Sequence, residues 1–270
     1  MEEKKIWVNG EPFSISGYHD YHCERFHWTL EKLKMMGASK ILEVGAHPWG
    51  MTAQMIDTPG FEICATVSAE EMTDWPDDIG VHVHPYHLRT ESGNEARFNN
   101  YSANVERTIF DIQEKPDTIL ACEIVEHLVR SPHIMFLNFN RWLPVSGKLI
   151  VTTPNGAQFS NPLRRKTVTP NYRCNIYERH QYVFTQDGLV DLIELCGFKI
   201  LETGYCDVIK RQGPSKVYGW LGALPWQYFQ DKFKKTIYVI AEKEKTVSET
   251  ERCPTVYDVR GRWEFVKRES

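Results

Sequence analysis

Several features are missing from the sequence, and each absence narrows the class of protein. The seven cysteines form no C-x-x-C pair and their number is odd, which predicts reduced thiols rather than a disulfide framework. The first ten residues lack the apolar core of a secretory signal, so we expect a cytoplasmic protein. The most apolar stretch, 216–229, is too short to cross a bilayer and is interrupted by Pro225, so no transmembrane segment is expected.

Neither sign of charge dominates the chain. Lys and Arg number 32 and Asp and Glu number 36, so the formal net charge is 32 − 36 = −4. A weakly acidic chain is a poor candidate for nonspecific binding to nucleic acid or to anionic lipid. Hydrophobic residues make up 41% of the sequence, which is enough to build a buried core and excludes a disordered chain.

Short apolar runs alternate with helix-compatible stretches along most of the chain. The runs predict buried strands at 41–44, 62–67, 118–122, 148–152, 198–202 and 236–242. The stretches predict helices at 21–36, 51–56, 124–129, 134–142 and 186–196, and Gly37 is expected to end the first of them. This alternation predicts an α/β fold with a doubly wound, mostly parallel sheet covered by helices on both faces.

The chain divides into three parts on this interpretation. Residues 1–36 are expected to be an N-terminal helical segment, 37–243 the α/β domain, and 244–270 a charged C-terminal extension. An aromatic insert at 205–235 interrupts the domain before its last strand. Its residues 216–229 could cover a substrate, contact a membrane surface peripherally or simply pack as an insert, and the sequence leaves these alternatives open.

Residues 41–50, ILEVGAHPWG, combine a buried strand with a turn that contains two glycines and a proline. In a doubly wound sheet, ligands bind at the carboxyl ends of the strands, where a turn without bulky side chains lets the backbone approach them. The carboxylate of Glu43 is suited to meet a cationic amine there.

This stretch resembles the first motif of class I S-adenosylmethionine-dependent methyltransferases, an acidic residue followed by a glycine-rich turn. The sequence departs from that motif in having His47-Pro48-Trp49 where a second glycine is usual. Three later segments resemble further motifs of the same family in the same order: E-x-x-E-H-L within 116–128, T-T-P-N within 141–155, and a histidine followed by an aromatic-Thr pair and Gly-Phe within 180–198. The resemblance spans 41–198 and implies a seven-stranded Rossmann-like sheet with an antiparallel final hairpin, and S-adenosylmethionine as cofactor.

The same resemblance implies which residues form the cofactor pocket. The loop residues are Glu43, Gly45, Ala46, His47 and Gly50, with Glu123 beside them. Family members hold the ribose hydroxyls with an acidic residue at the end of the second strand; here that position is Ser68, with Glu70 and Glu71 beyond it as alternatives. Asn104 stands roughly where an Asp or Asn meets the adenine amine, since an amide oxygen can accept that hydrogen bond.

Glu123, Glu126 and His127 carry the predicted chemistry. Their spacing of i, i+3 and i+4 would place all three on one face of a helix at the end of a strand. His127 is then expected to act as general base, supported by the two glutamates and completed by His180 from a distant segment. Small-RNA 3′-end 2′-O-methyltransferases look similar here and bind a divalent metal with such a set, whereas many relatives with E-x-x-E-H-L are metal-free, so both alternatives stay open.

The acceptor is expected to be a hydroxyl of a saccharide or another polar small molecule, by analogy with bacterial relatives that carry the T-T-P-N motif. Arg164, Arg165 and Lys166 could hold the phosphate of a nucleotide sugar or a lipid-linked saccharide, or form a solvated loop. RNA 3′-terminal 2′-O-methylation is the alternative reaction, which the weakly acidic charge disfavours. A non-catalytic binding module is the third alternative, and the intact E-x-x-E-H set argues against it.

Overall fold

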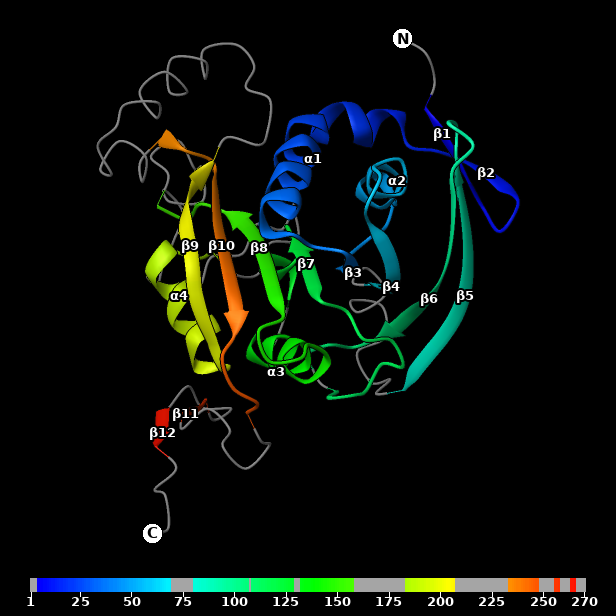
Figure 1. Ribbon diagram of the computed structural model, residues 1–270. Coiled ribbons are helices and arrows are strands. Elements are labelled where there is room, and N and C mark those ends of the chain that lie inside the picture. Colours follow the sequence, from blue (N-terminus) through cyan, green and yellow to red (C-terminus); the bar gives the residue numbers. More distant parts are fainter. Residues whose placement is uncertain are drawn as a thin grey trace.

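The protein is described by a computed structural model, which covers residues 4–68, 80–106, 108–128, 132–157, 183–206 and 233–247 together with the backbone of 255–257 and 263–265. Its centre is a sheet of ten strands (Figure 1). The strands are β1 (Lys5–Val8), β2 (Glu11–Ser14), β3 (Lys40–Val44), β4 (Glu62–Ser68), β5 (Val81–Thr90), β6 (Glu95–Ala103), β7 (Thr118–Cys122), β8 (Lys148–Pro154), β9 (Phe198–Cys206) and β10 (Thr236–Lys243). The helices are α1 (Ser16–Met36), α2 (Gly50–Ile56), the 3-10 turn η2 (Val125–His127), α3 (Pro132–Trp142) and α4 (Gln186–Leu195). A separate hairpin pairs β11 (Thr255–Tyr257) with β12 (Trp263–Phe265).

The strand order is β2-β1-β5-β6-β4-β3-β7-β8-β10-β9. Strands β6, β4, β3, β7 and β8 run parallel, which confirms the parallel centre, and β9 and β10 form an antiparallel hairpin. The expected count of seven strands is wrong, because β5, β1 and β2 extend one edge by antiparallel pairing. Strands β2 and β5 escape sequence reasoning because their side chains are largely exposed, and β1 escapes it because its apolar run is only four residues long.

The extra strands also change the N-terminal segment. Residues 1–36 were expected to be helical, but β1 and β2 precede α1 and join the main sheet. Helix α1 begins five residues before the predicted start and ends as predicted, with Gly37 in the left-handed region at φ 67° and its N–H donated to the carbonyl of Lys34.

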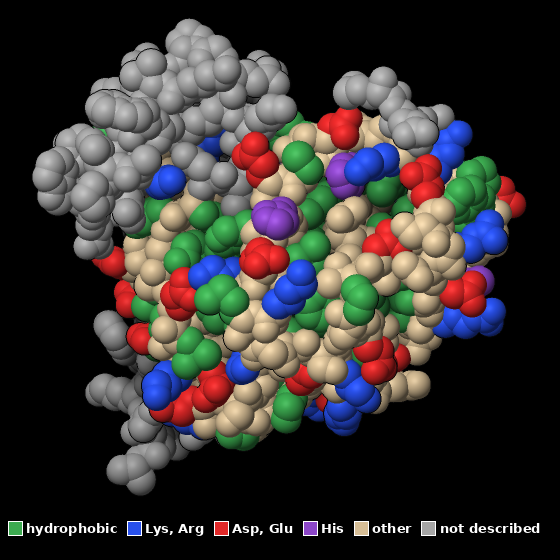
Figure 2. Space-filling view, turned by 45° about the horizontal axis from the view of Figure 1, so that its top comes forward, with side chains coloured by type: hydrophobic (Ala, Val, Ile, Leu, Met, Phe, Trp, Pro, Cys, Tyr) green, Lys and Arg blue, Asp and Glu red, His purple; other side chains and the backbone are tan. Residues whose placement is uncertain are grey.

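The surface carries both signs of charge. On the face shown in Figure 2, Lys and Arg side chains alternate with Asp and Glu, and apolar side chains lie between them. Over the described ranges of the chain, no helix is long and apolar enough to span a membrane.

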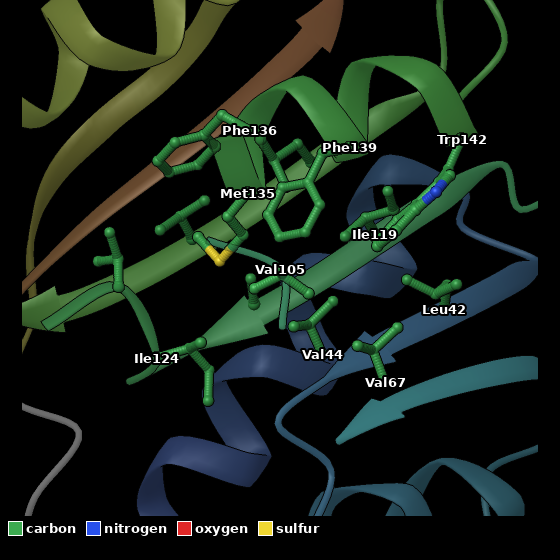
Figure 3. Packing of buried hydrophobic residues seen from close by; sticks show 14 of the residues in the cluster. Leu42, Val44, Val67, Val105, Ile119, Ile124, Met135, Phe136, Phe139 and Trp142 are labelled. Atoms are coloured by element: carbon green, nitrogen blue, oxygen red, sulfur yellow. The ribbon is translucent and has the colours of Figure 1, made fainter. Parts of the chain in front are cut away.

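Helices cover both faces of the sheet, as expected for a doubly wound fold. On one face, Phe136, Phe139 and Trp142 of α3 pack against Leu42 and other inward residues of β3, β4 and β7 (Figure 3). On the opposite face, α1 and α2 pack against residues that alternate with these along the strands, including Ile41, Leu120 and Ile150. Alternation along each strand therefore sends successive side chains into two separate cores.

Candidate active site

The loops after the parallel strands gather at one edge of the sheet. Gly45 follows β3, Ser68 ends β4, Asn104 follows β6, Glu123 follows β7 and Asn155 follows β8. Because these five strands are parallel, their carboxyl ends share an edge. The structure therefore places the predicted cofactor residues and the predicted catalytic glutamates at the same edge.

The loop between β3 and α2 is held by aromatic contacts. Gly45 has φ 73° and donates its N–H to the carbonyl of Val67 at 2.8 Å. Trp49 precedes α2 and has a left-handed backbone conformation. The centroid of its ring lies 4.8 Å from that of His47, 5.5 Å from that of Phe13 in β2 and 5.6 Å from that of Tyr86 in β5. The departure from the glycine-rich motif is thus accommodated by the extra strands, which supply the aromatic wall against which the bulkier loop packs.

Gly50 has a steric role at the start of α2. A Cβ atom at this position would lie 3.0 Å from the ring of Phe26 and 3.1 Å from that of Tyr18, both on α1. The second glycine of the motif therefore lets α1 approach the loop closely.

Glu43 is a buried carboxylate with one strong partner. Its side chain is 6% exposed and accepts a hydrogen bond from the hydroxyl of Thr52 at 2.6 Å. Burial raises the pKa of Glu43 to about 7, while the hydrogen bond from Thr52 and the charge of Arg25 limit the rise. Glu43 therefore titrates near neutral pH, and a cationic group bound beside it would favour its ionised form.

Arg25 is a functional candidate that sequence reasoning missed. It lies on α1, is 5% exposed, and donates to the hydroxyl of Tyr18 at 2.8 Å. Arg25, Tyr18, Glu43 and Gly45 line one narrow cavity of about 10 Å³, which has room for a small charged end of a ligand and not for its whole body. The sequence contained a signal for it, because Arg25 lies next to Phe26 on the side of α1 that is buried. A charged residue on the buried side of a helix usually forms an ion pair or contacts a ligand.

The E-x-x-E-H set has a geometry different from the predicted helix face. Glu123 has φ 58° and donates its backbone N–H to the carbonyl of Thr152, and only η2 follows it. The helical i, i+3, i+4 prediction is therefore wrong, because Glu123 itself lies outside the right-handed helical region and only a three-residue 3-10 turn forms after it.

The two glutamates are nevertheless held together by the T-T-P-N motif. The hydroxyl of Thr152 donates to Glu123 at 2.9 Å, and that of Thr153 donates to Glu126 at 2.9 Å. These two sequence motifs are thus one structural unit, with one threonine for each carboxylate. Asn155 completes it by donating to the carbonyl of Lys234, which ties the end of β8 to the segment before β10.

The protonation states of the pair differ. Burial raises the pKa of both carboxyls, and the negative charge of Glu123 raises that of Glu126 further. Arg25 lowers the pKa of both carboxyls, but only the pKa of Glu126 is raised further by its neighbour, so Glu123 is the member that ionises first. Glu126 is 1% exposed, and its Oε1 atom has no hydrogen bond within the described part of the chain but lies 3.9 Å from Nε2 of His127. The His127 side chain is 42% exposed and can meet a ligand.

The remaining predicted residues are placed as follows. Asn100 donates to the Ser68 hydroxyl at 2.8 Å, and the side-chain oxygen of Asn104 accepts the N–H of Glu106 at 3.1 Å. Both sit at the ends of neighbouring strands on the shared edge. His180, Glu70, Glu71, Arg164, Arg165, Lys166 and the stretch 216–229 lie outside the described residues.

A metal shell does not form from the residues that the structure describes. Among them, no three His, Cys, Asp or Glu side chains come together as a metal site. Glu123 and Glu126 each use an oxygen to accept from a threonine instead. We therefore derive no step of the chemistry through a metal ion.

Comparison with known proteins identifies the fold. No protein-family model matches the sequence, and no curated protein matches it. A crystal structure of an S-adenosylmethionine-dependent methyltransferase from Clostridium acetobutylicum ATCC 824 is similar with a TM-score of 0.53 and 10% identity, over 86% of this chain and 98% of that one. A complex between the Haloferax volcanii Trm112 methyltransferase activator and the putative methyltransferase is similar with a TM-score of 0.54 and 11% identity. The match covers 87% of this chain and 94% of that one. The small RNA methyltransferase HEN1 is similar with a TM-score of 0.50 and 14% identity, over 83% of this chain and 25% of that one. The chain thus has the Rossmann-like fold of S-adenosylmethionine-dependent methyltransferases.

Proposed function

We propose that the protein transfers a methyl group from S-adenosylmethionine to a hydroxyl oxygen of a polar small molecule. The observation that carries the proposal is the meeting of two groups of residues at one sheet edge in this fold. Glu43, Gly45 and Arg25 form one group, and Glu123, Glu126 and His127 form the other. A donor site and an acceptor site must lie side by side for methyl transfer, and the placement of both groups at one edge supports this assignment.

The first group suits an amino acid with a positively charged sulfur. Glu43 offers a carboxylate to the donor's ammonium group, and Arg25 with Tyr18 offers donors to its carboxylate. The backbone of Gly45 and Ala46 lines the same cavity without bulky side chains. Ser68 and Asn104, at the ends of the next strands, are assigned to the ribose and the adenine.

The second group suits removal of a proton from the acceptor. When bound, the donor supplies a methyl group on sulfonium sulfur, which leaves with the carbon–sulfur bond electrons remaining on sulfur. The acceptor oxygen forms the new bond to carbon and loses its proton to His127, whose exposed ring can reach it. Oε1 of Glu126, 3.9 Å from Nε2 of His127, is placed to stabilise the protonated imidazole, and Glu123 is assigned to the same supporting role.

A saccharide hydroxyl is the acceptor that we favour, and RNA is the alternative. The fold similarity to HEN1 supports the RNA alternative. Against it, positive and negative side chains are interspersed on the surface seen in Figure 2, whereas RNA binding needs a basic track.

The test is methyl transfer to components of a cell extract with an isotopically labelled methyl donor, followed by mass spectrometry of the labelled product. The His127→Gln variant should lose about 100-fold or more of the turnover while still binding the donor. His87→Gln, on β5 and paired with Glu95, is the matched control and should be fully active. Equal turnover by the wild type and His127→Gln would overturn the assignment of the base.

A further inference from the structure

Helix α1 turns one stripe of side chains toward the sheet edge that carries the proposed donor site. Tyr18 and Arg25 of this stripe line the narrow cavity that Glu43 also lines. His22 follows Tyr18 by four residues and precedes Arg25 by three, so it lies between them on the same face of the helix. His22 does not itself line the cavity, but the residues one turn before and one turn after it do. The proposed function has so far given this histidine no role.

The position of His22 on the helix faces inward, yet its side chain is only half-buried. Arg25 and Phe26, the next residues on this face, are buried, and so is Thr29 one turn further on. A half-buried side chain in line with buried ones has open space beside it, because a packed core would cover it. His22 is therefore accessible on the face that it shares with Tyr18 and Arg25.

Aromatic rings hold the imidazole of His22 in place. The centroid of its ring lies 4.4 Å from that of Tyr18, 4.7 Å from that of Tyr21 and 6.2 Å from that of Phe26. Its Nδ1 atom is buried and has no hydrogen-bond partner among the residues that the structure describes. Buried polar atoms in proteins usually have a partner, so an imidazole that is packed but not hydrogen-bonded calls for an explanation.

The ring of His22 is neutral. Burial, together with the positive charge of Arg25, lowers the pKa of His22 from its ordinary 6.5 to about 3. A neutral imidazole has one N–H to donate and one nitrogen that accepts. It can therefore donate to an anionic group without placing a second positive charge beside the sulfonium of a methyl donor.

We infer that His22 is a third residue that binds the carboxylate of the methyl donor, beside Arg25 and Tyr18. The inference rests on the proposed function, in which Arg25 and Tyr18 meet that carboxylate. The two oxygens of a carboxylate offer about four lone-pair sites, so they can accept from a guanidinium, a phenol and an imidazole together. The cavity holds only the small charged end of a ligand, and His22 stands between the two residues of α1 that hold this end.

Calorimetry on the full chain tests this inference with S-adenosylmethionine and its decarboxylated analogue, which keeps the sulfonium, the amine and the nucleoside. The His22→Phe variant retains an aromatic ring for the contacts with Tyr18 and Tyr21 but has no N–H. It should bind S-adenosylmethionine about tenfold more weakly than the wild type does, and the analogue within about twofold of the wild type. His27→Phe, at an exposed position of the same helix, is the matched control and should bind both ligands as the wild type does.

Thermal unfolding separates a binding role of His22 from a packing role. His22→Phe should unfold at the same temperature as the wild type or at a higher one, because phenylalanine leaves no buried nitrogen without a partner. If this variant does not fold, His22→Leu replaces it with the same expectations for the two ligands.

Undiminished binding of S-adenosylmethionine by the folded variant, or an equal loss of affinity for both ligands, would overturn the inference. Either result would leave the proposed function standing, because the wild type would still bind the donor. Binding of neither ligand by the wild type at millimolar concentration would overturn the proposed function and the inference together.

Discussion

Replacing Glu43 by Gln should stabilise the folded protein at alkaline pH. The amide keeps the shape of the carboxyl group and can still accept the hydrogen bond from Thr52. Burial raises the pKa of Glu43 from its ordinary 4.5 to about 7. A carboxyl group with a raised pKa stabilises the fold while it is protonated, and this contribution is lost as the pH rises from the unfolded value through the folded one.

The magnitude follows from the two pKa values. A pKa unit corresponds to about 1.4 kcal/mol, so ionising Glu43 in the folded state costs about 3 kcal/mol at pH of about 8. Glu43→Gln removes this cost. The free energy of unfolding of the variant should then exceed that of the wild type by about 3 kcal/mol at pH of about 8, and by less than about 1 kcal/mol at pH of about 5.

Urea denaturation at the two pH values measures both differences. Glu62→Gln is the matched control, because Glu62 begins the neighbouring strand with a largely exposed carboxylate and should give no pH-dependent gain. A gain of equal size at both pH values, or a less stable variant at alkaline pH, would refute the assignment of Glu43 as a carboxylate that is costly to ionise. Glu43→Gln should also bind the donor more weakly, because it lacks the carboxylate proposed to meet the donor's ammonium group. A residue that destabilises the fold and is needed for binding is the usual trade-off between stability and function.

Three further substitutions test other parts of the structure. Thr153→Val removes the hydrogen bond to buried Glu126 and should lower the free energy of unfolding by about 1–3 kcal/mol, measured with urea; an unchanged value would mean that this bond is not formed. Asn140→Ala removes the hydrogen bonds donated to the carbonyls of Cys196 and Lys245 and the one accepted from the N–H of Val247, so a loss of about 2–3 kcal/mol is expected, and thermal unfolding unaltered from the wild type would contradict the role of this residue. Trp49→Ala should weaken donor binding about tenfold, whereas Trp49→Phe should retain it. Equal affinities of the two variants in calorimetry would exclude the contacts of Trp49 with Phe13 and Tyr86 as the support of the loop.

The sequence predicted the centre of the fold well and its edge poorly. Strands β3, β4, β7 and β8 are continuous apolar runs because both of their faces are buried, and such runs are visible in a sequence. Strand β5 begins with exposed valines that alternate with exposed histidines, and only its end, at Leu88 and Thr90, is buried, so it shows no apolar pattern. Its place in the sheet depends on pairing with β6, which is a long-range contact that local pattern does not encode.

The assignment of Glu43, Glu123, Glu126 and His127 to one site, made from motif order, stays a prediction. The geometry expected for it was wrong, since the spacing suggested a helix where Glu123 takes a left-handed conformation. The threonines that hold the glutamates lie about 30 residues away on β8, and only the parallel pairing of β7 with β8 brings them together. Arg25 was missed because a single charge in a helical stripe is easily read as an exposed residue.

The most direct test of the account is calorimetric titration of the wild type and Arg25→Gln with S-adenosylmethionine. We expect one donor per chain for the wild type and affinity weakened about tenfold or more in the variant, because Arg25 and Glu43 line the same cavity. Absence of binding by the wild type at millimolar donor, or undiminished affinity in Arg25→Gln, would contradict the assignment of this cavity to the methyl donor.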